Sequence, residues 1–225
     1  MSIDSKTIRD LLSGKLEQEL ENILNQPAPP YNEAMYWNER YVRHPEPFEW
    51  FQPWTAFKGA VLPLIPGRKK AIDIGCGNSP MTSDLLKDGF EKVVGFDISS
   101  VVIESNRKKF SDEKRLEWVI GNVLNLSTFE AESFDAVFDK GTFDCLATTG
   151  LSNLQVSQFF TNIFRILKPG GVFVEISFGT PKTRQMFVNN SIEGWKNVLN
   201  QEIEKKNDRG NYHYVYCLQK DAEEE

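Results

Sequence analysis

The chain has 225 residues, of which 40% are hydrophobic and 26% are charged, a composition typical of soluble globular proteins. A formal net charge of −6 argues against a broad nucleic-acid interface, and the lack of a run of about 18 apolar residues argues against a membrane span. The three cysteines, Cys76, Cys145 and Cys217, lie far apart, so we expect a reducing, cytoplasmic setting with neither disulfides nor a cysteine metal site.

The first 30 residues are predicted to form an amphipathic helix and a proline-rich linker. Residues 7–26 place apolar side chains at helical spacing along one face, and Pro27-Ala28-Pro29-Pro30 ends the pattern. We interpret this helix as packed on the protein's own surface, and a docking helix for a partner is the alternative. The main domain is expected to span residues 31–220, with residues 221–225 as a short acidic tail.

An aromatic segment follows the linker and precedes the first predicted strand. Its rings are Tyr31, Tyr36, Trp37, Tyr41, Phe48, Trp50, Phe51, Trp54 and Phe57. So many rings in a short stretch either pack on a domain face or cover a bound ligand. Residues 55–64 are then predicted to be helical.

Predicted strands and helices alternate along the rest of the chain. Short apolar stretches predict parallel strands at residues 71–74, 92–97, 116–122, 133–139 and 172–178. Helices are predicted at 80–88, ended by Gly89, at 101–110, capped by Ser99 or Ser100, and at 154–167. A helical turn at 182–187 and an antiparallel strand pair at 195–204 and 212–219 complete the chain. This order predicts a doubly wound, Rossmann-like α/β sheet of seven strands with the last strand antiparallel, which binds ligands at the carboxyl ends of its strands.

A glycine turn ends the first predicted strand, within Asp73-Ile74-Gly75-Cys76-Gly77-Asn78-Ser79. Gly75 and Gly77 let the backbone approach a ligand closely, but Pro80 stands where a pyrophosphate-binding turn would need a third glycine. No Gly-Lys-Ser/Thr follows, which argues against a nucleoside triphosphate loop. The turn therefore indicates an adenosine compound without a pyrophosphate, and S-adenosylmethionine is the candidate. We place Gly75, Gly77 and Asn78 among its binding residues, and a simple tight turn is the alternative.

Polar residues end the next two predicted strands at the same edge of the sheet. Asp97 can accept hydrogen bonds from both ribose hydroxyls, with Ile98 against the adenine, and a helix N-cap is the alternative for this carboxylate. Asn122 and Val123 offer a side-chain carbonyl and a backbone N–H to the adenine edge. A turn asparagine is the alternative for Asn122.

The fourth predicted strand ends in Asp139-Lys140-Gly141-Thr142-Phe143-Asp144, where charged groups would face a methyl group to be transferred. We interpret Asp139 as a catalytic candidate that orients an acceptor amine or passes its proton to water, and Lys140 as a cofactor neighbour through its backbone. A solvated strand end is the alternative. His44 and His213 are isolated from other candidate ligands, so the sequence predicts no metal site.

Together these motifs resemble a known enzyme family. The stretches Tyr36-Trp37-Asn38-Glu39-Arg40-Tyr41 and Phe48-Glu49-Trp50-Phe51, the glycine turn, Asp97-Ile98 and the fourth strand end are similar to the elongation factor 1-alpha lysine methyltransferases of the methyltransferase-like-13 type. These are class I S-adenosylmethionine-dependent enzymes, and the resemblance covers about residues 31–220. It implies cofactor contacts from Trp37, Tyr41, Trp50, Gly75, Asp97, Ile98, Asn122, Val123 and Lys140. Asn122 departs from the family, which usually has an acid there.

The resemblance implies a lysine of a protein as the methyl acceptor. We therefore expect a monomeric protein-lysine methyltransferase that acts on a basic protein, a translation elongation factor in particular. A small-molecule methyltransferase on the same fold and a catalytically silent cofactor-binding scaffold are the alternatives. A nucleic-acid methyltransferase is disfavoured, because the net charge is negative and the fourth strand lacks the Asn/Asp-Pro-Pro-aromatic run of such enzymes.

Overall fold

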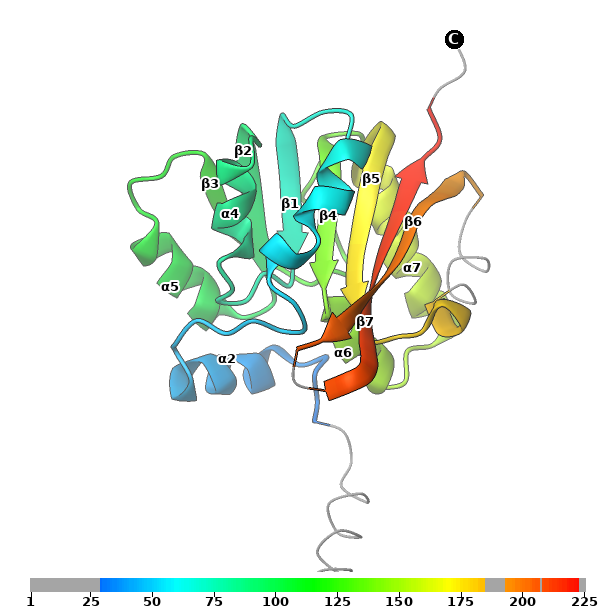
Figure 1. Ribbon diagram of the computed structural model, residues 1–225. Coiled ribbons are helices and arrows are strands. Elements are labelled where there is room, and N and C mark those ends of the chain that lie inside the picture. Colours follow the sequence, from blue (N-terminus) through cyan, green and yellow to red (C-terminus); the bar gives the residue numbers. More distant parts are fainter. Residues whose placement is uncertain (1–28, 185–192, 207, 223–225) are drawn as a thin grey trace, which may run out of the picture.

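The computed structural model describes residues 29–184, 193–206 and 208–222 of the chain (Figure 1). The strands are β1 (Lys70–Ile74), β2 (Lys92–Asp97), β3 (Leu116–Ile120), β4 (Phe134–Lys140), β5 (Leu167–Ser177), β6 (Trp195–Lys205) and β7 (Asp208–Lys220). The α-helices are α2 (Ala34–Arg43), α3 (Lys58–Val61), α4 (Met81–Lys87), α5 (Ser100–Lys109), α6 (Thr142–Thr148) and α7 (Asn153–Ile166). The 3₁₀ turns η1 (Trp54–Ala56) and η2 (Leu62–Leu64) flank α3.

The strands form one seven-stranded sheet in the order β3-β2-β1-β4-β5-β7-β6. Strands β1 to β5 are parallel, whereas β7 runs antiparallel to both β5 and β6. This topology confirms the predicted doubly wound sheet with an antiparallel last strand. The predicted helix at 7–26 and the end of the acidic tail lie outside the described residues.

Two hydrophobic cores lie on the two faces of the sheet, because successive side chains of a strand point to opposite sides. On β1, Ala71 packs in the core that α3, α4 and α5 cover, while Ile72 and Ile74 pack in the core that α6 and α7 cover. Both faces of the central strands are therefore apolar, as expected for a parallel sheet buried on both sides. Figure 1 shows the cyan residues before β1 and helix α4 in front of the sheet, and α7 behind it.

Local structure differs from the sequence prediction in several places, among them helix α2, which was not predicted. Helix α6 was not predicted, and the predicted helix at 55–64 is broken into η1, α3 and η2. Strand β5 begins at Leu167, five residues earlier than expected, because residues 168–171 bulge between two paired positions of β4 and β5. Residues 181–184 are helical, and the rest of the predicted helical turn at 182–187 lies outside the described residues.

The sheet order creates a binding crevice at the carboxyl ends of β1 and β4. From β1 the chain moves outward to β2 and β3 and then returns to the other side of β1 as β4. Neighbouring connections therefore lie on opposite faces, and a crevice opens between them. Helix α2 lies across this end of the sheet (Figure 1), where Asn38 Oδ1 accepts hydrogen bonds from Ser99 Oγ over 2.7 Å and from Val101 N over 3.3 Å. In the described residues, no helix is long and apolar enough to cross a membrane.

Candidate functional site

A cavity of about 260 Å³ occupies the crevice at the carboxyl ends of β1, β2, β3 and β4. All the residues predicted to bind the cofactor line it: Trp37, Tyr41, Trp50, Gly75, Gly77, Asn78, Asp97, Ile98, Asn122, Val123 and Lys140. The structure thus brings together residues that are up to 103 positions apart, from Trp37 to Lys140. Asp139 is not among the lining residues.

The glycine turn forms the floor of the cavity because side chains would not fit there. Gly75 has φ +67°, and a Cβ atom on it would lie 1.8 Å from Thr142 Oγ1. Gly77 has φ +53°, and its Cβ would lie 2.7 Å from the Tyr41 hydroxyl. The left-handed backbone and the close approach both require glycine. The turn therefore leaves a backbone cradle that a ligand can approach closely.

Asp97 lies at the end of β2 with 5% of the residue exposed. Its Oδ2 accepts a hydrogen bond from Gly77 N over 2.9 Å, and its Oδ1 accepts one from Ser99 N over 2.8 Å. Burial raises the pKa of this carboxyl to about 6 despite these bonds. Ser99, not Asp97, caps helix α5, because the Ser99 side chain accepts a hydrogen bond from Val102 N. The carboxylate thus connects the glycine turn to the β2 end.

Asn122 and Val123 follow β3 at the far end of the cavity. Asn122 is exposed, and its Oδ1 accepts a hydrogen bond from Leu124 N over 2.9 Å, which is the geometry of an asparagine turn. Val123 is buried in the cavity wall with 7% exposed. The two residues therefore present a polar turn and an apolar wall side by side.

Lys140 ends β4, and the residue is 8% exposed. Its ammonium forms an ion pair with Glu49 and donates to Ser79 Oγ over 3.2 Å, while the Ser79 hydroxyl donates to Glu49 Oε1 over 2.9 Å. We expected Lys140 to lie near the cofactor through its backbone, and sequence reasoning missed the ion pair of its side chain with Glu49. An unpaired ammonium at this place would repel a sulfonium ion, so Glu49 makes the cavity compatible with a cationic ligand.

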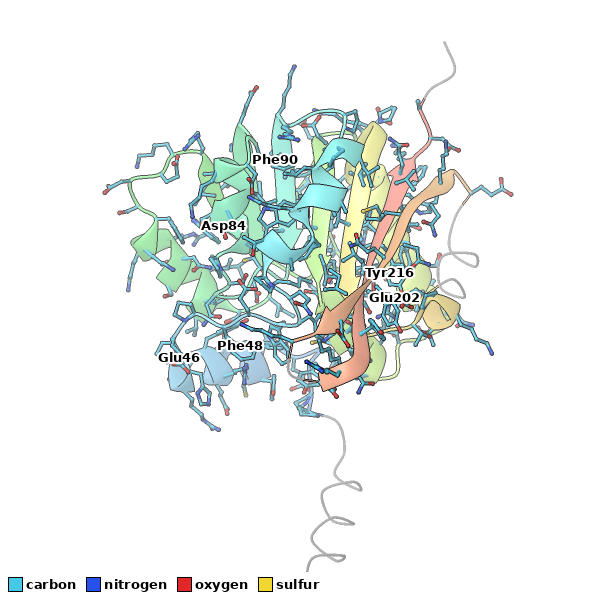
Figure 2. All side chains as sticks on the ribbon, in the orientation of Figure 1. Glu46, Phe48, Asp84, Phe90, Glu202 and Tyr216 are labelled. Carbon is cyan, nitrogen blue, oxygen red and sulfur yellow. The ribbon has the colours of Figure 1, made fainter. Side chains whose placement is uncertain are left out.

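A strap of residues 46–51 closes one side of the cavity and is fastened to the glycine turn. Asn78 Nδ2 donates to the Glu46 carbonyl over 2.6 Å, and Phe48 N donates to Asn78 Oδ1 over 3.3 Å. Figure 2 labels Glu46 and Phe48, which lie in this strap near α2. Phe51 has φ +62°, and its ring covers Gly141, where a Cβ atom would come within 2.8 Å of it. The side chain of Asn78 therefore holds the strap.

Asp139, the catalytic candidate of the sequence analysis, is held at the start of α6 and does not line the cavity. It is fully buried, and its two oxygens accept hydrogen bonds from Thr142 N over 2.8 Å and Phe143 N over 3.0 Å, at the start of α6. Burial raises the pKa of Asp139 to about 7. Both oxygens satisfy amides that the helix itself leaves free, so the geometry favours a role in positioning α6.

Asp144 is the acid of this motif that does line the cavity. It is 2% exposed, forms an ion pair with Arg184, and accepts hydrogen bonds from Ser177 Oγ over 2.7 Å and Phe178 N over 3.2 Å. These contacts join α6 to the end of β5 and to the residues that follow it. Sequence reasoning gave Asp144 no separate role, because Arg184 lies 40 positions away.

The residues of the cavity fit S-adenosylmethionine. The glycine cradle admits a ligand at backbone distance, Asp97 offers a carboxylate at the β2 end, and Trp37, Tyr41 and Trp50 supply aromatic faces for a sulfonium. A sheet of this order with a cavity of this chemistry is the arrangement expected of an S-adenosylmethionine-dependent methyltransferase. A family model described as a methyltransferase domain matches residues 72–174.

Similar proteins define more narrowly the family to which the chain belongs. It is 30% identical over 175 residues to EEF1A lysine methyltransferase 4 of Bos taurus, covering 73% of this chain and 68% of the relative. It is 28% identical over 178 residues to the eEF1A lysine and N-terminal methyltransferase of Bos taurus, covering 77% of this chain and 26% of that longer relative. The solved structure of an S-adenosylmethionine-dependent methyltransferase from Methanosarcina mazei has a TM-score of 0.55 and 18% identity, covering 72% of this chain and 98% of that one. The chain belongs to the methyltransferase family that includes EEF1A lysine methyltransferase 4.

Proposed function

We propose that the chain is an S-adenosylmethionine-dependent protein-lysine N-methyltransferase and that its acceptor is translation elongation factor 1-alpha. The names of its relatives support this acceptor. The observation that carries the proposal is the mouth of the cavity, where Phe48 and Phe178 both line the cavity and remain 44% and 49% exposed. The cavity therefore reaches the surface through an apolar rim. A lysine suits such a mouth, because its methylene stem packs on rings while its amine reaches inward.

The chemistry of the site follows from desolvation and orientation. The cofactor supplies a methyl group on a sulfonium, and the protein orients the reactants and excludes water. The acceptor lysine has an ordinary pKa of about 10.4 and must lose its proton before it attacks. Aromatic walls from Trp37, Trp50 and Phe178 disfavour the charged amine and lower that pKa. The proton leaves to water at the mouth.

The buried acids near the mouth act as positioning residues in this proposal. Asp139 holds the first amides of α6, and Asp144 is paired with Arg184. Neither presents an unpaired carboxylate to an incoming amine, so an obligate general base is not part of the mechanism. This arrangement keeps α6 and the end of β5 fixed beside the reacting groups.

The proposal extends to the organisation of the whole chain. We assign residues 31–220 to the methyltransferase domain, and residues 1–30 and 221–225 to segments that precede and follow it. The protein acts as a monomer in the cytoplasm, where elongation factors work, and has no nucleic-acid or membrane partner. Its net charge of −6 favours encounter with a basic protein.

The test is methyl transfer to a defined acceptor. The purified chain is incubated with tritium-labelled S-adenosylmethionine and elongation factor 1-alpha made in bacteria, and the modified residue is identified by mass spectrometry. We expect label on lysine with the wild type, no label with Asp97→Ala, and unchanged label with the exposed-site control Glu104→Ala. Label confined to small molecules of a whole-cell lysate would instead support the small-molecule alternative. Cofactor binding without transfer to any acceptor would support the silent scaffold.

A further inference from the structure

A second hollow lies beside the cofactor cavity and contains a cation that the proposed mechanism has not used. Its volume is about 180 Å³, and it is lined by Arg40, Tyr41, His44, Glu46, Phe48, Trp50 and Asn78. Tyr41, Phe48, Trp50 and Asn78 also line the main cavity, so the two hollows share a wall. The half-buried Arg40 lies on α2, and its guanidinium carbon is 5.4 Å from the ring centroids of both Phe48 and Trp50.

Arg40 differs from neighbouring charged residues because no acid among the described residues forms an ion pair with it. Arg43, three residues later on α2, forms an ion pair with Glu39 over 3.0 Å, and Glu46 lies 3.5 Å from His44. In the described part of the chain, Arg40 contacts two rings and forms no ion pair. Ring faces hold a guanidinium in place but leave its N–H groups available in the plane. Arg40 is therefore positioned to bind an anion.

Among the described residues that line the main cavity, none offers an unpaired cation to a carboxylate ligand. Asp73, Asp97 and Asp144 line it, and among its described lining residues Lys140 is the one lysine or arginine. The Lys140 ammonium is already paired with Glu49. S-adenosylmethionine carries an α-carboxylate at its methionyl end. Asp144 is neutralised by Arg184, but placing that carboxylate near Asp73 and Asp97 without a cation would be unfavourable.

The sheet order directs the methionyl end toward Arg40. In the proposed binding mode the nucleoside lies over the ends of β3 and β2, because Asn122 and Asp97 follow those strands. Strand β1 is next in the sheet, so the methionyl part extends over the glycine turn that ends at Asn78. Asn78 is hydrogen-bonded to the strap that carries Phe48 and Trp50, the two rings that hold Arg40.

We propose that Arg40 binds the α-carboxylate of the cofactor through its guanidinium N–H groups. A guanidinium matches a carboxylate with two parallel hydrogen bonds, which a lysine cannot reproduce. This inference rests on the cofactor alone and is independent of the acceptor that we propose. It makes Arg40 the residue by which the protein distinguishes a nucleoside with an amino-acid side chain from one whose side chain carries an amine but no carboxylate.

The experiment compares two ligands by isothermal titration calorimetry on the full chain. S-adenosylhomocysteine is titrated beside its decarboxylated analogue, which keeps the amine and lacks the carboxylate. Wild type is expected to bind S-adenosylhomocysteine at least tenfold more tightly than the analogue, and Arg40→Gln to bind both within about twofold of each other. Arg40→Lys should retain an intermediate preference, and the matched control Arg43→Gln should behave as wild type.

Several results would overturn the proposal. Arg40→Gln could lower the affinity for both ligands by the same factor, which would show that Arg40 only supports the rings. The preference could persist in Arg40→Gln and disappear in Lys140→Met, which would make Lys140 the carboxylate partner. If wild type bound neither ligand, both this proposal and the assignment of the cofactor would be wrong. A lack of lysine methylation would contradict only the proposed acceptor.

Discussion

Replacement of Asp97 by asparagine should weaken cofactor binding much more than it changes the free energy of unfolding. A carboxylate can accept hydrogen bonds from both ribose hydroxyls, whereas an amide offers one oxygen and no charge. Hydrogen bonds to charged groups contribute about 1.5–3 kcal/mol each. The loss of one such bond predicts a decrease in cofactor affinity of roughly 10- to 150-fold.

The same substitution should change the free energy of unfolding much less. Burial raises the pKa of Asp97 from 3.8 to about 6, so keeping this group ionised at pH 7 costs the folded state about 3 kcal/mol. Asparagine removes that cost but turns an N–H₂ group toward Gly77 N or Ser99 N, which leaves a buried donor unsatisfied and costs about 1–3 kcal/mol. The two effects offset each other to within about 2 kcal/mol.

The assay measures S-adenosylhomocysteine affinity from pH 5 to pH 8, with urea unfolding of both proteins as the control. The ionised carboxylate is the better acceptor, so wild-type affinity should fall as the pH decreases through about 6. Asp73, with a pKa of about 7, lines the cavity in both proteins, and the difference between the two pH curves isolates Asp97. A folded Asp97→Asn protein with wild-type affinity at pH 7.5 would refute the ribose assignment.

Two further substitutions test the cradle and the strap. Gly75→Ala combines φ +67° with a Cβ atom 1.8 Å from Thr142 Oγ1, so urea unfolding should show a loss of at least about 2 kcal/mol. Adding Thr142→Ala to Gly75→Ala should recover part of this loss, whereas adding Thr142→Ser should not. If Gly75→Ala cost the same in the wild-type, Thr142→Ala and Thr142→Ser chains, the result would contradict the predicted clash. Glu49→Gln leaves the buried Lys140 ammonium without its counter-ion, which should cost about 2 kcal/mol and speed cofactor release in stopped-flow measurements. Lys140→Met in the same chain should restore most of the stability, and a double variant less stable than Glu49→Gln would show that the pair does not fasten the strap.

The strand pattern and the glycine turn could be predicted because both depend on neighbouring residues. Parallel strands buried on both faces are short apolar runs, and the turn after β1 needs glycine at Gly75 and Gly77 for steric reasons. The carboxyl ends of parallel strands meet at one edge of the sheet, so residues after each strand converge on one cavity wherever the loops run. That is why the predicted cofactor residues share a single cavity.

Helix α6 was missed because its stability comes from distant parts of the fold. It has seven residues, too few to be stable alone, and its first amides are held by Asp139. Phe143 and Leu146 pack in the core that α7 covers. Sequence periodicity over so short a segment does not distinguish a helix from a loop.

The charged motif at the end of β4 shows what the sequence alone could not decide. In the sequence, Asp139, Lys140 and Asp144 form one cluster of charges facing a methyl group. In the structure they divide: Asp139 binds the α6 amides, Lys140 pairs with Glu49 over a sequence separation of 91 residues, and Asp144 pairs with Arg184. The sequence by itself determined the sheet, the backbone cradle and the class of ligand, because those follow from local sterics and strand order. Only the tertiary structure decided which of these charges are neutralised, because each buried charge needs a partner and those partners come from elsewhere in the chain.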